Sequence, residues 1–570
     1  MKEWCIRHKY SVIFIAFLVC FFGYNISRVY GFIFFPDEFG YWSYAAKAAG
    51  YDWSDMVSLG SYYSYGYSLI LFPIFKLCKD SVMAYRVAVT LNFVLLGIVY
   101  FMLFWLAKKL FGNKSGVALY AAIAVFYPSW LFYAKTTMAE IVLMTLFIVI
   151  SVLIYRYLEN SKLSTLVGLV VALVYIHFIH MRAIGILIAG VVTLFLYFWL
   201  QSGKAKQLLV ALVIGSLVLI AGFAVKEVMQ KLLYTSAGAD TININDYAGQ
   251  LEKVFAVFSK DGITNLVCGL AGKILYLGLA SFGLIYWGIW HAIKEVASFC
   301  KQIRNKEEKE IRKLFFVFVI LATVAETLIN AIYNIQPYRV DNVVYGRYHE
   351  FVLPILMVLG LEEITKTSKK MVGTVVIAGI QLPMVCMVNY LVNKYQLTNI
   401  HGYIMVGMSY LYQPEGFEPS RFYWTAYLFE IGLTVFVTSI MNVVRKQKGE
   451  ILLVLVIVLE FILSVKATTL YIEPSSLGAF RDTIVVEKIE ELQAKNPQRR
   501  IVYMKEDDSS FISIMQFMLR DQTIEIVTDK NEVTKSDIVL LQYDSTYGEE
   551  LLKQYSNYLL NGHFCIYYNP

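Results

Sequence analysis

Charged residues are scarce in this chain. Of its 570 residues, 16% are Asp, Glu, Lys or Arg, whereas soluble globular chains carry about 25%. Hydrophobic residues make up 58%, and the mean hydropathy is +0.57. This balance excludes a disordered chain, a collagen-like chain and an ordinary cytosolic enzyme. Because the apolar residues are gathered in long runs, the sequence predicts a polytopic α-helical membrane protein.

Cysteine and histidine are also few. The seven Cys are scattered singly without a CxxC pair, and the seven His form no HExxH, which argues against a cysteine-based metal site or redox centre. We find no internal repeat and no low-complexity tract. The net charge of +7 comes from basic residues in short connections between apolar runs. In that position they indicate topology, so no nucleic-acid partner is expected.

A helix needs about 20 apolar residues to cross the hydrocarbon core. By this criterion the sequence predicts about thirteen spans, at 10–30, 86–107, 116–134, 138–155, 163–178, 183–202, 207–225, 268–291, 314–333, 349–363, 371–392, 423–444 and 451–468. Segment 163–178 is short, and segment 349–363 is free of charge only over 351–361.

The connections between the spans indicate an orientation. Every connection assigned to the cytoplasmic side carries Lys or Arg, as at 108–114 and 366–370, whereas the others carry acids such as Asp37 and Asp341. The positive-inside rule therefore places the N-terminus in the cytoplasm. With an odd number of spans, the C-terminal region lies outside. We expect an integral protein of the plasma membrane.

The composition changes after the last span, which divides the chain into a membrane domain (1–468) and a smaller region (469–570). That region is polar and mixed, and it contains a single cysteine, Cys565. Strands are predicted at 501–504, 524–527, 538–541 and 564–568, with helices between them at 483–494, 509–519 and 547–560. This pattern predicts a small extracytoplasmic α/β domain.

The first external loop, 31–81, is long and opens with Pro36-Asp37-Glu38. Proline and carboxylates are favourable at a helix N-terminus, so a helix is predicted over 37–49. Its aromatic and alanine residues would form an apolar face lying flat at the membrane interface. On the acid pair alone, capping of this helix is a better interpretation of Asp37 than catalysis.

Other polar residues lie at the same outer level. Glu140 begins the fourth span, Arg182 lies between the fifth and sixth spans, and Arg347 follows the ninth. A glutamate at the edge of a span is costly unless it is paired or faces water. We therefore expect two acids and two or three arginines in one external cavity. The alternative is that Arg182 and Arg347 bind lipid headgroups.

Three further acids, Glu326, Glu430 and Glu460, lie inside predicted spans. They are either functional residues or satisfied residues of the helix bundle, and the sequence does not separate the two.

The external acids and arginines suit the transfer of a sugar from a lipid phosphate. Arginine binds phosphate through two parallel hydrogen bonds. A carboxylate can take the proton of an attacking hydroxyl, and carboxylates also favour the oxocarbenium-like charge that develops on the sugar.

The segment Pro36-Asp37-Glu38-Phe39-Gly40-Tyr41-Trp42-Ser43-Tyr44-Ala45 resembles the GT-C superfamily of integral-membrane glycosyltransferases. The resemblance is closest to the branch that contains protein O-mannosyltransferases and lipid A aminoarabinose transferases. Gly346-Arg347-Tyr348 with Pro354 is similar to an Arg-Tyr…Pro segment near the lipid-phosphate site of that branch. The thirteen-span plan with an external C-terminal domain is similar too. The resemblance covers about 1–465.

This resemblance implies an inverting glycosyltransferase that uses a polyprenyl-phosphate sugar and a hydroxyl acceptor on a glycan, a lipid or a protein. Asp37 would be the general base, and Glu38 and Glu140 would be further catalytic acids. The residues expected to bind the donor phosphate are Lys135, Arg182, Arg347, Tyr348 and His349. Metal use varies in the superfamily, so a divalent cation (Mg²⁺ or Mn²⁺) between Asp37 and Glu140 is left open.

Two other functions are compatible with the sequence. One is a flippase or other transporter of lipid-linked glycans, supported by the acids inside the spans. The other is a non-catalytic assembly protein of the cell envelope, whose external domain binds a polymer. Because the acids gather at the outer surface and no repeat is visible, the transferase is favoured.

Overall fold

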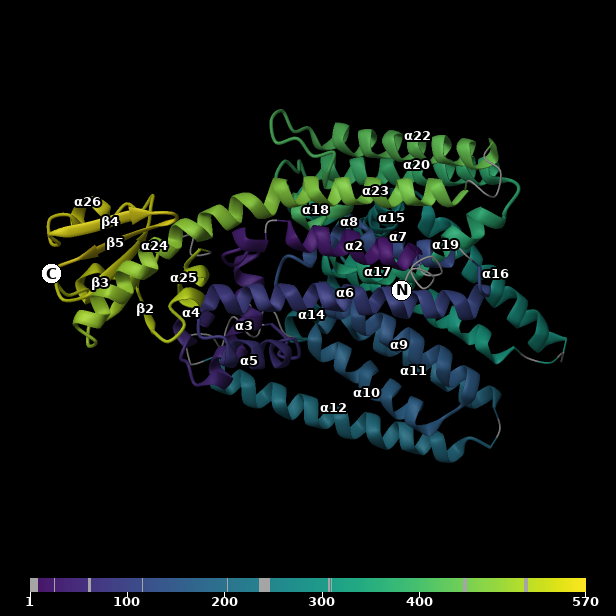
Figure 1. Cartoon of the computed structure of the whole chain (residues 1–570), viewed down its shortest axis with the longest axis horizontal. Coiled ribbons are helices and arrows are strands. Elements are labelled where there is room, and N and C mark those ends of the chain that lie inside the picture. Colours follow the sequence, from purple (N-terminus) through teal and green to yellow (C-terminus); the bar gives the residue numbers. More distant parts are fainter. Residues whose placement is uncertain are drawn as a thin grey trace.

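The computed structural model describes residues 9–570, except 25, 60–62, 115, 202, 235–246, 306–307, 309, 444–448 and 507–510. The N-terminal segment 1–8, on which part of the orientation argument rests, lies outside the described residues. Long helices run side by side in a bundle, and a small sheet lies beyond one end of it, at the left of Figure 1. The helices of the first external loop are at the same end.

Helices occupy all the predicted spans. Ten of those in the described residues are long and apolar enough to cross a membrane. They belong to α2 (Lys9–Gly23), α6 (Ser81–Phe111), α9 (Glu140–Asn160), α11 (Ile184–Leu200), α12 (Ala205–Leu233), α15 (Gly262–Ala280), α17 (Leu314–Tyr333), α20 (Lys370–Lys394), α22 (Pro419–Val443) and α23 (Gly449–Ala467). Three predicted spans are shorter helices: α7 (Val117–Phe126) with α8 (Pro128–Tyr133), α10 (Leu163–Ile179) and α19 (Leu353–Lys366). A polytopic helical membrane protein is thus confirmed, while the number thirteen stays a prediction.

The prediction of one continuous helix over 268–291 was wrong. The chain forms α15 and α16 (Leu284–Arg304), which are separated where Phe282 and Gly283 adopt φ angles of 50° and 76°. A helix cannot continue through left-handed residues. Beyond the break, the backbone of α16 comes close to α19. A Cβ on Gly288 would lie only 2.1 Å from the carbonyl oxygen of Leu356.

The first external loop folds into α3 (Phe35–Ala49), α4 (Ser54–Ser58) and α5 (Ser68–Leu77). The predicted helix over 37–49 is confirmed, with proline and two acids in its first turn. The apolar face of this helix, predicted to lie against the membrane, packs inside the protein instead. Phe39, Trp42 and Ala46 are buried inside the protein, where α3 packs against α5 and the C-terminal region.

The remaining short helices of the bundle are η1 (Ile26–Arg28), η2 (Met181–Ala183), α14 (Tyr247–Ala256), η4 (Ile311–Lys313), α18 (Val340–Val344), η5 (Gly346–Tyr348), η6 (Glu350–Val352), η7 (Gly402–Ile404) and α21 (Val406–Ser409). Several of them lie in the connections predicted to be external, and they hold the polar residues discussed below.

The C-terminal region holds a five-stranded mixed sheet in the order β2-β1-β3-β5-β4. Its elements are α24 (Glu473–Lys495), β1 (Ile501–Met504), α25 (Ile512–Met518), β2 (Ile524–Val527), η10 (Lys530–Glu532), β3 (Ile538–Gln542), α26 (Gly548–Leu551), β4 (Asn557–Asn561) and β5 (Phe564–Tyr568). The four predicted strands and the α/β class are confirmed. The first two residues of the predicted helix 509–519 lie outside the described residues.

The helix predicted over 547–560 was wrong in its second half. Only α26 is helical, and the chain then forms β4, which pairs with β5 in an antiparallel hairpin. The turn has Gly562 at a φ of 58°, a conformation that favours glycine.

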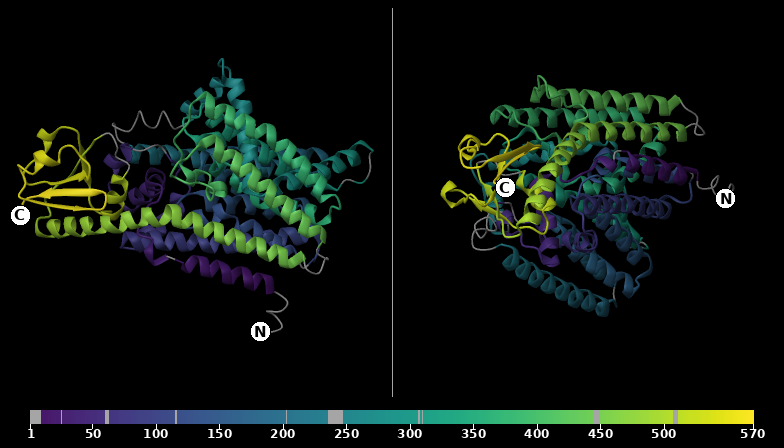
Figure 2. Two further views of the ribbon diagram at one scale, coloured as in Figure 1. Left: turned by 90° about the horizontal axis from the view of Figure 1, so that it is seen from above. Right: turned by 60° about the vertical axis from the view of Figure 1, so that its left-hand side comes forward.

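A continuous helical rod joins the bundle to this sheet. Span α23 passes through the π-helix η9 (Thr468–Ile472) into α24, and Figure 2 shows the rod running past the end of the bundle. The domain boundary predicted at 468/469 therefore falls inside a helix.

The C-terminal region also contacts the first external loop. The Trp53 indole donates to the carbonyl oxygen of Arg520 at 2.9 Å, and the Arg520 guanidinium donates to the carbonyl oxygens of Cys78 (2.5 Å) and Lys79 (3.0 Å). These contacts tie the C-terminal region to the loop that carries Asp37.

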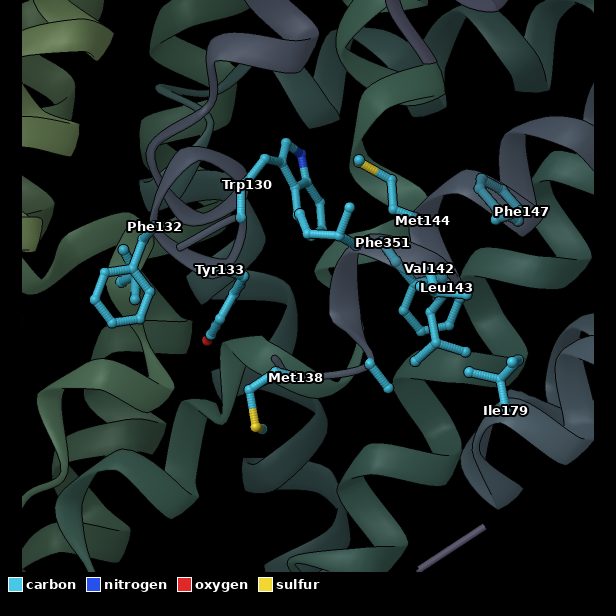
Figure 3. Close-up of a cluster of buried hydrophobic side chains, with 14 of the residues drawn as sticks. Trp130, Phe132, Tyr133, Met138, Val142, Leu143, Met144, Phe147, Ile179 and Phe351 are labelled. Atoms are coloured by element: carbon cyan, nitrogen blue, oxygen red, sulfur yellow. The ribbon is translucent and has the colours of Figure 1, made fainter. Parts of the chain in front are cut away.

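An apolar core supports the N-terminal end of α9. Figure 3 shows Trp130, Met138, Phe147 and Phe351 among the buried side chains that come together there from several segments. Glu140 begins α9 beside this core, so its carboxylate is held on a rigid base.

Candidate active site

A cavity of about 420 Å³ opens between the first external loop, the α10–α11 link and the segment around η5. Its lining residues are Asp37, Tyr63, Ser64, His180, Met181, Arg182, Ile184, Lys253, Val254, Glu326, Ile329, Asn330, Ile332, Tyr333, Tyr345, Arg347 and Tyr348. Four of the predicted site residues, Asp37, Arg182, Arg347 and Tyr348, therefore share one cavity.

Four charged side chains form a continuous chain of ion pairs. Arg347 Nη2 lies 2.5 Å from Asp37 Oδ2, and Arg347 Nε lies 3.0 Å from Glu140 Oε1. The same Glu140 oxygen accepts a hydrogen bond from Arg182 Nη2 at 2.8 Å. Asp37 is the most exposed of the four, with 23% of its side chain accessible, against 5% or less for the others. The predicted convergence of acids and arginines is present.

Helix α3 presents Asp37 to the cavity. Pro36 is compatible with the first helical turn, where its missing N–H has no partner to lose. Tyr63 donates a hydrogen bond to Asp37 Oδ1 at 2.7 Å. Burial raises the pKa of the Tyr63 phenol well above its usual range, and the Asp37 charge raises it further. Tyr63 therefore remains protonated and serves as a donor to Asp37.

The position of Arg347 depends on an unusual backbone. Tyr345 adopts a φ of 33°, which is uncommon for a residue with a side chain. Its carbonyl oxygen accepts a hydrogen bond from Asn330 at 2.8 Å. A Cβ on Gly346 would lie 2.0 Å from the Tyr276 ring, so only glycine fits there. The Gly346-Arg347 pair thus directs the guanidinium toward Asp37.

Tyr348 lies beside both arginines. The guanidinium carbon of Arg182 is 4.4 Å from the centre of the Tyr348 ring, and that of Arg347 is 5.5 Å from it. Guanidinium groups are attracted to aromatic faces at such distances. The ring therefore helps to hold the two cations close to each other.

Several buried polar atoms near the ion pairs have no hydrogen-bond partner among the described residues. They are Glu140 Oε2, Arg182 Nε, Arg182 Nη1, Glu326 Oε2 and Arg347 Nε. The last of these is close to Glu140, as given above, but the contact lacks hydrogen-bond geometry. Buried N–H groups are seldom left unpaired in proteins. The free donors of the two arginines indicate that this region receives an anion or water.

Glu38 does not line the cavity. Its Oε1 accepts from the backbone N–H groups of Ile33 (2.5 Å) and Phe34 (2.8 Å). Its Oε2 accepts from the Tyr85 hydroxyl at 2.7 Å, and from the backbone N–H (2.7 Å) and hydroxyl (2.6 Å) of Thr137. Burial raises its pKa, although these hydrogen bonds oppose the shift. Glu38 ties the entry of α3 to α6 and to the turn before α9.

Two predicted phosphate ligands also lie apart from the arginines. His349 is buried, with Nδ1 2.6 Å from the Asn330 side-chain nitrogen and Nε2 3.1 Å from the carbonyl oxygen of Lys273. The ammonium group of Lys135 donates to the carbonyl oxygen of Tyr24 and lines a different cavity.

A divalent cation does not fit between Asp37 and Glu140 as they are placed here. The Arg347 guanidinium lies between the two carboxylates. Among the described residues, no three His, Cys, Asp or Glu side chains are grouped so that they could hold a metal ion. The chemistry below is therefore assigned to side chains alone.

Sequence reasoning did not assign Tyr63, Lys253 or Tyr333 to the site. The Lys253 ammonium lies 3.4 Å from the centre of the Tyr333 ring, and burial lowers the Lys253 pKa to about 8. No motif identifies these residues. Tyr63 lies in a tyrosine-rich stretch of the first loop, and Lys253 and Tyr333 lie in helices far from it in sequence. Glu326 was noted only as an acid inside a span, and it lines the cavity.

The described residues form a polytopic helical membrane protein with a small C-terminal α/β region, as the sequence predicted. The chain matches the structure of apo ArnT from Cupriavidus metallidurans with a TM-score of 0.54 and 13% identity, over 99% of this chain and 98% of that one. It matches the same protein bound to undecaprenyl phosphate with a TM-score of 0.53 and 12% identity, over 98% of both chains. No protein-family model and no curated protein matches the sequence. At these identities, the likeness shows a shared fold.

Proposed function

We propose that this protein is a membrane glycosyltransferase that moves a sugar from a polyprenyl-phosphate donor to a hydroxyl acceptor, with Asp37 as the general base. The observation that carries the proposal is the ion-pair chain Asp37–Arg347–Glu140–Arg182, of which Asp37, Arg182 and Arg347 line one cavity. The fold shared with ArnT, a protein whose structure contains undecaprenyl phosphate, supports a polyprenyl phosphate as the lipid.

The two arginines are suited to bind the donor phosphate. Arg182 has two nitrogen atoms, Nε and Nη1, whose N–H groups have no partners among the described residues, and its guanidinium already lies beside Arg347 and Tyr348. Phosphate binding would satisfy these donors with charge-assisted hydrogen bonds. It would also stabilise the phosphate as it leaves the sugar, since preorganised cations act most strongly in a site that excludes water.

Asp37 is suited to accept the proton of the acceptor. The acceptor hydroxyl oxygen forms a bond to the anomeric carbon while the bond from that carbon to the phosphate oxygen breaks. The phosphate leaves with the electron pair, and Asp37 takes the hydroxyl proton. Attack from the face opposite the phosphate inverts the configuration. Tyr63 and Arg347 hold the two Asp37 oxygens, which orients the carboxylate.

Glu140 acts on the arginines as a positioning residue. One of its oxygens lies within 3.0 Å of both guanidinium groups, and a carboxylate between two cations reduces their mutual repulsion. We further propose that the site faces the extracytoplasmic side, as the distribution of basic connections indicates.

The direct test uses purified protein with polyprenyl phosphates that carry either a hexose or a pentose. Product is detected by mass spectrometry, and the acceptor class is first narrowed by comparing envelope glycans of cells with and without the protein. If Asp37 is the general base, Asp37→Asn lowers turnover by about 10²-fold or more. Donor affinity falls much less, because the arginines remain.

Asp52→Asn is the matched control. Asp52 lies in the same loop, with 57% of its side chain exposed and paired with Lys47, and it is not among the cavity residues. Full turnover is expected in this variant. Equal turnover of Asp37→Asn and the unaltered protein would remove Asp37 from the chemistry.

A transporter of lipid-linked glycans is the second candidate, and Glu326 favours it. This buried acid lies inside α17, lines the cavity, and has one oxygen without a partner among the described residues. Transporters place such acids along the substrate path. Movement of a lipid-linked glycan across proteoliposomes without any covalent product would support this function over the transferase.

A further inference from the structure

A second cavity of about 580 Å³ lies where α23 passes into α24. It is lined by Arg28, Val29, Tyr30, Lys135, Thr468, Thr469, Ile472, Glu473, Pro474, Ser476, Leu477 and Phe480. None of these residues lines the cavity that holds Asp37. The second cavity is therefore a separate place in the molecule, to which the proposed transfer reaction assigns no role.

The most buried charged residue that lines this cavity is Lys135, which is 1% exposed. Its ammonium lies 4.7 Å from the centre of the Phe21 ring and 4.9 Å from that of Tyr24. An ammonium group has three N–H donors, and among the described residues this one donates to the carbonyl oxygen of Tyr24 alone. Burying an ammonium is costly unless its donors are satisfied. Donors therefore remain for a ligand.

Two further groups suit an anion. Ser476 is 3% exposed, and its hydroxyl has no hydrogen-bond partner among the described residues. The exposed side chain of Arg28 adds a second cation. The cavity has one acid, Glu473, whose charge favours the protonated form of Lys135. With two cations and one acid, the charged lining has a net charge of +1.

The other walls of the cavity are mainly apolar. Leu477 and Phe480, on the first turns of α24, are 51% and 43% exposed. Helix α24 continues from the span α23 through η9, and this rod extends past the end of the bundle (Figures 1 and 2). A cavity with apolar walls and a buried ammonium group suits an amphiphile with an anionic headgroup. The wall also contains the π-helix η9, and π-helices are frequent at functional sites.

We propose that this cavity binds an anionic headgroup, a phosphate or a carboxylate, through Lys135, Ser476 and Arg28. The headgroup belongs to a membrane lipid, or the same residues bind a free anion. Burial lowers the Lys135 pKa to about 8, so most of the ammonium is charged at neutral pH. This assignment gives Lys135 a role distinct from that of Arg182 and Arg347.

The experiment measures binding to the full-length protein purified in a neutral detergent. Phosphatidylglycerol is titrated and followed by native mass spectrometry, with phosphatidylcholine as the neutral comparison and inorganic phosphate as the soluble competitor. Phosphatidylglycerol is expected to bind in preference to phosphatidylcholine. Lys135→Met should weaken that binding about tenfold or more, since it removes a charged hydrogen-bond donor, and Ser476→Ala should weaken it less.

Lys76→Met is the matched control, because Lys76 is exposed in the first external loop and is absent from both cavities. Folding of Lys135→Met is checked by its unfolding temperature, and its affinity for undecaprenyl phosphate, which should not change, is measured separately. If this variant does not fold, Ser476→Ala and Arg28→Gln carry the test, since Arg28 is exposed.

The outcomes separate the two sources of the anion. Lipid binding that depends on Lys135 and resists inorganic phosphate identifies a lipid headgroup, whereas displacement by inorganic phosphate identifies a free anion. Equal binding of the two lipids to the unaltered protein, with no effect of inorganic phosphate, would overturn the proposal. So would unchanged phosphatidylglycerol affinity in every folded variant, or a loss of undecaprenyl phosphate binding alone in Lys135→Met.

Discussion

Arg347 donates from Nη2 to Asp37 Oδ2 at 2.5 Å, across 310 residues of sequence. The contact joins the first external loop to the segment before α19. The candidate base is thus adjacent to a candidate phosphate ligand, and a phosphate held by Arg347 lies next to the group that takes the acceptor proton. Such placement converts a collision of substrates into a reaction within one complex.

Arg347→Lys tests whether the planar guanidinium is needed. Lysine keeps the charge, but it cannot form two parallel hydrogen bonds with a phosphate or reach Asp37 and Glu140 together. We expect undecaprenyl phosphate to bind about tenfold more weakly or worse. A titration followed by intrinsic fluorescence gives the affinity. Arg421→Lys, at an exposed position of α22, is the control, and equal affinities of the two variants would contradict the assignment.

Glu38→Gln distinguishes a structural role from a catalytic one. The carboxylate accepts five hydrogen bonds from three segments. Glutamine offers one oxygen, and its amide group would face N–H or O–H donors. We expect a loss of stability of about 1–3 kcal/mol, seen as a lower unfolding temperature, with little change in donor affinity. Normal stability together with a loss of turnover like that of Asp37→Asn would place Glu38 in the chemistry.

The sequence predicted the cluster of acids and arginines because charge patterning and a motif can both be recognised in the sequence alone. Acids and arginines in connections of one side of the membrane must lie at one level, which brought Asp37, Glu140, Arg182 and Arg347 together correctly. The sequence could not show which way neighbouring residues point. Asp37 and Glu38 are about 100° apart around a helix, and only the first faces the cavity.

Other features depend on tertiary contacts that no local pattern carries. Lys135 and Glu140 are five residues apart, yet Lys135 lines the cavity beside α24, whereas Glu140 pairs with the two arginines of the other cavity. The residues of β4 have a helical pattern, but pairing with β5 makes them a strand. The break between α15 and α16 depends on two residues, and an average of hydropathy over a span does not detect it.

Gly346→Ala tests the backbone that places Arg347. The added methyl group would lie 2.0 Å from the Tyr276 ring, so the ring or the segment must move. We expect undecaprenyl phosphate affinity and turnover to fall together, because Arg347 leaves its position. Gly97→Ala in α6 is the control, since a Cβ there meets nothing within 4 Å. A fully active Gly346→Ala would show that the close approach does not matter to the site.

Glu140→Gln tests whether a bound phosphate can replace the Glu140 carboxylate as the anion beside the two arginines. Glu140 is buried between Arg182 and Arg347, and removing one partner of a buried ion pair typically costs about 3–5 kcal/mol. The unfolding temperature of the variant should therefore fall. A phosphate then restores part of the lost charge balance, and a ligand that binds only the folded state stabilises it by mass action. Undecaprenyl phosphate should raise the unfolding temperature more in Glu140→Gln than in the unaltered protein.

Glu362→Gln is the control. Glu362 is also buried and paired with cations, Lys114 at 2.5 Å and Lys366 at 2.7 Å, but it is absent from the lining of the arginine cavity. It should be destabilised without any extra gain from the lipid. Equal gains in the two variants would mean that Arg182 and Arg347 do not bind the phosphate.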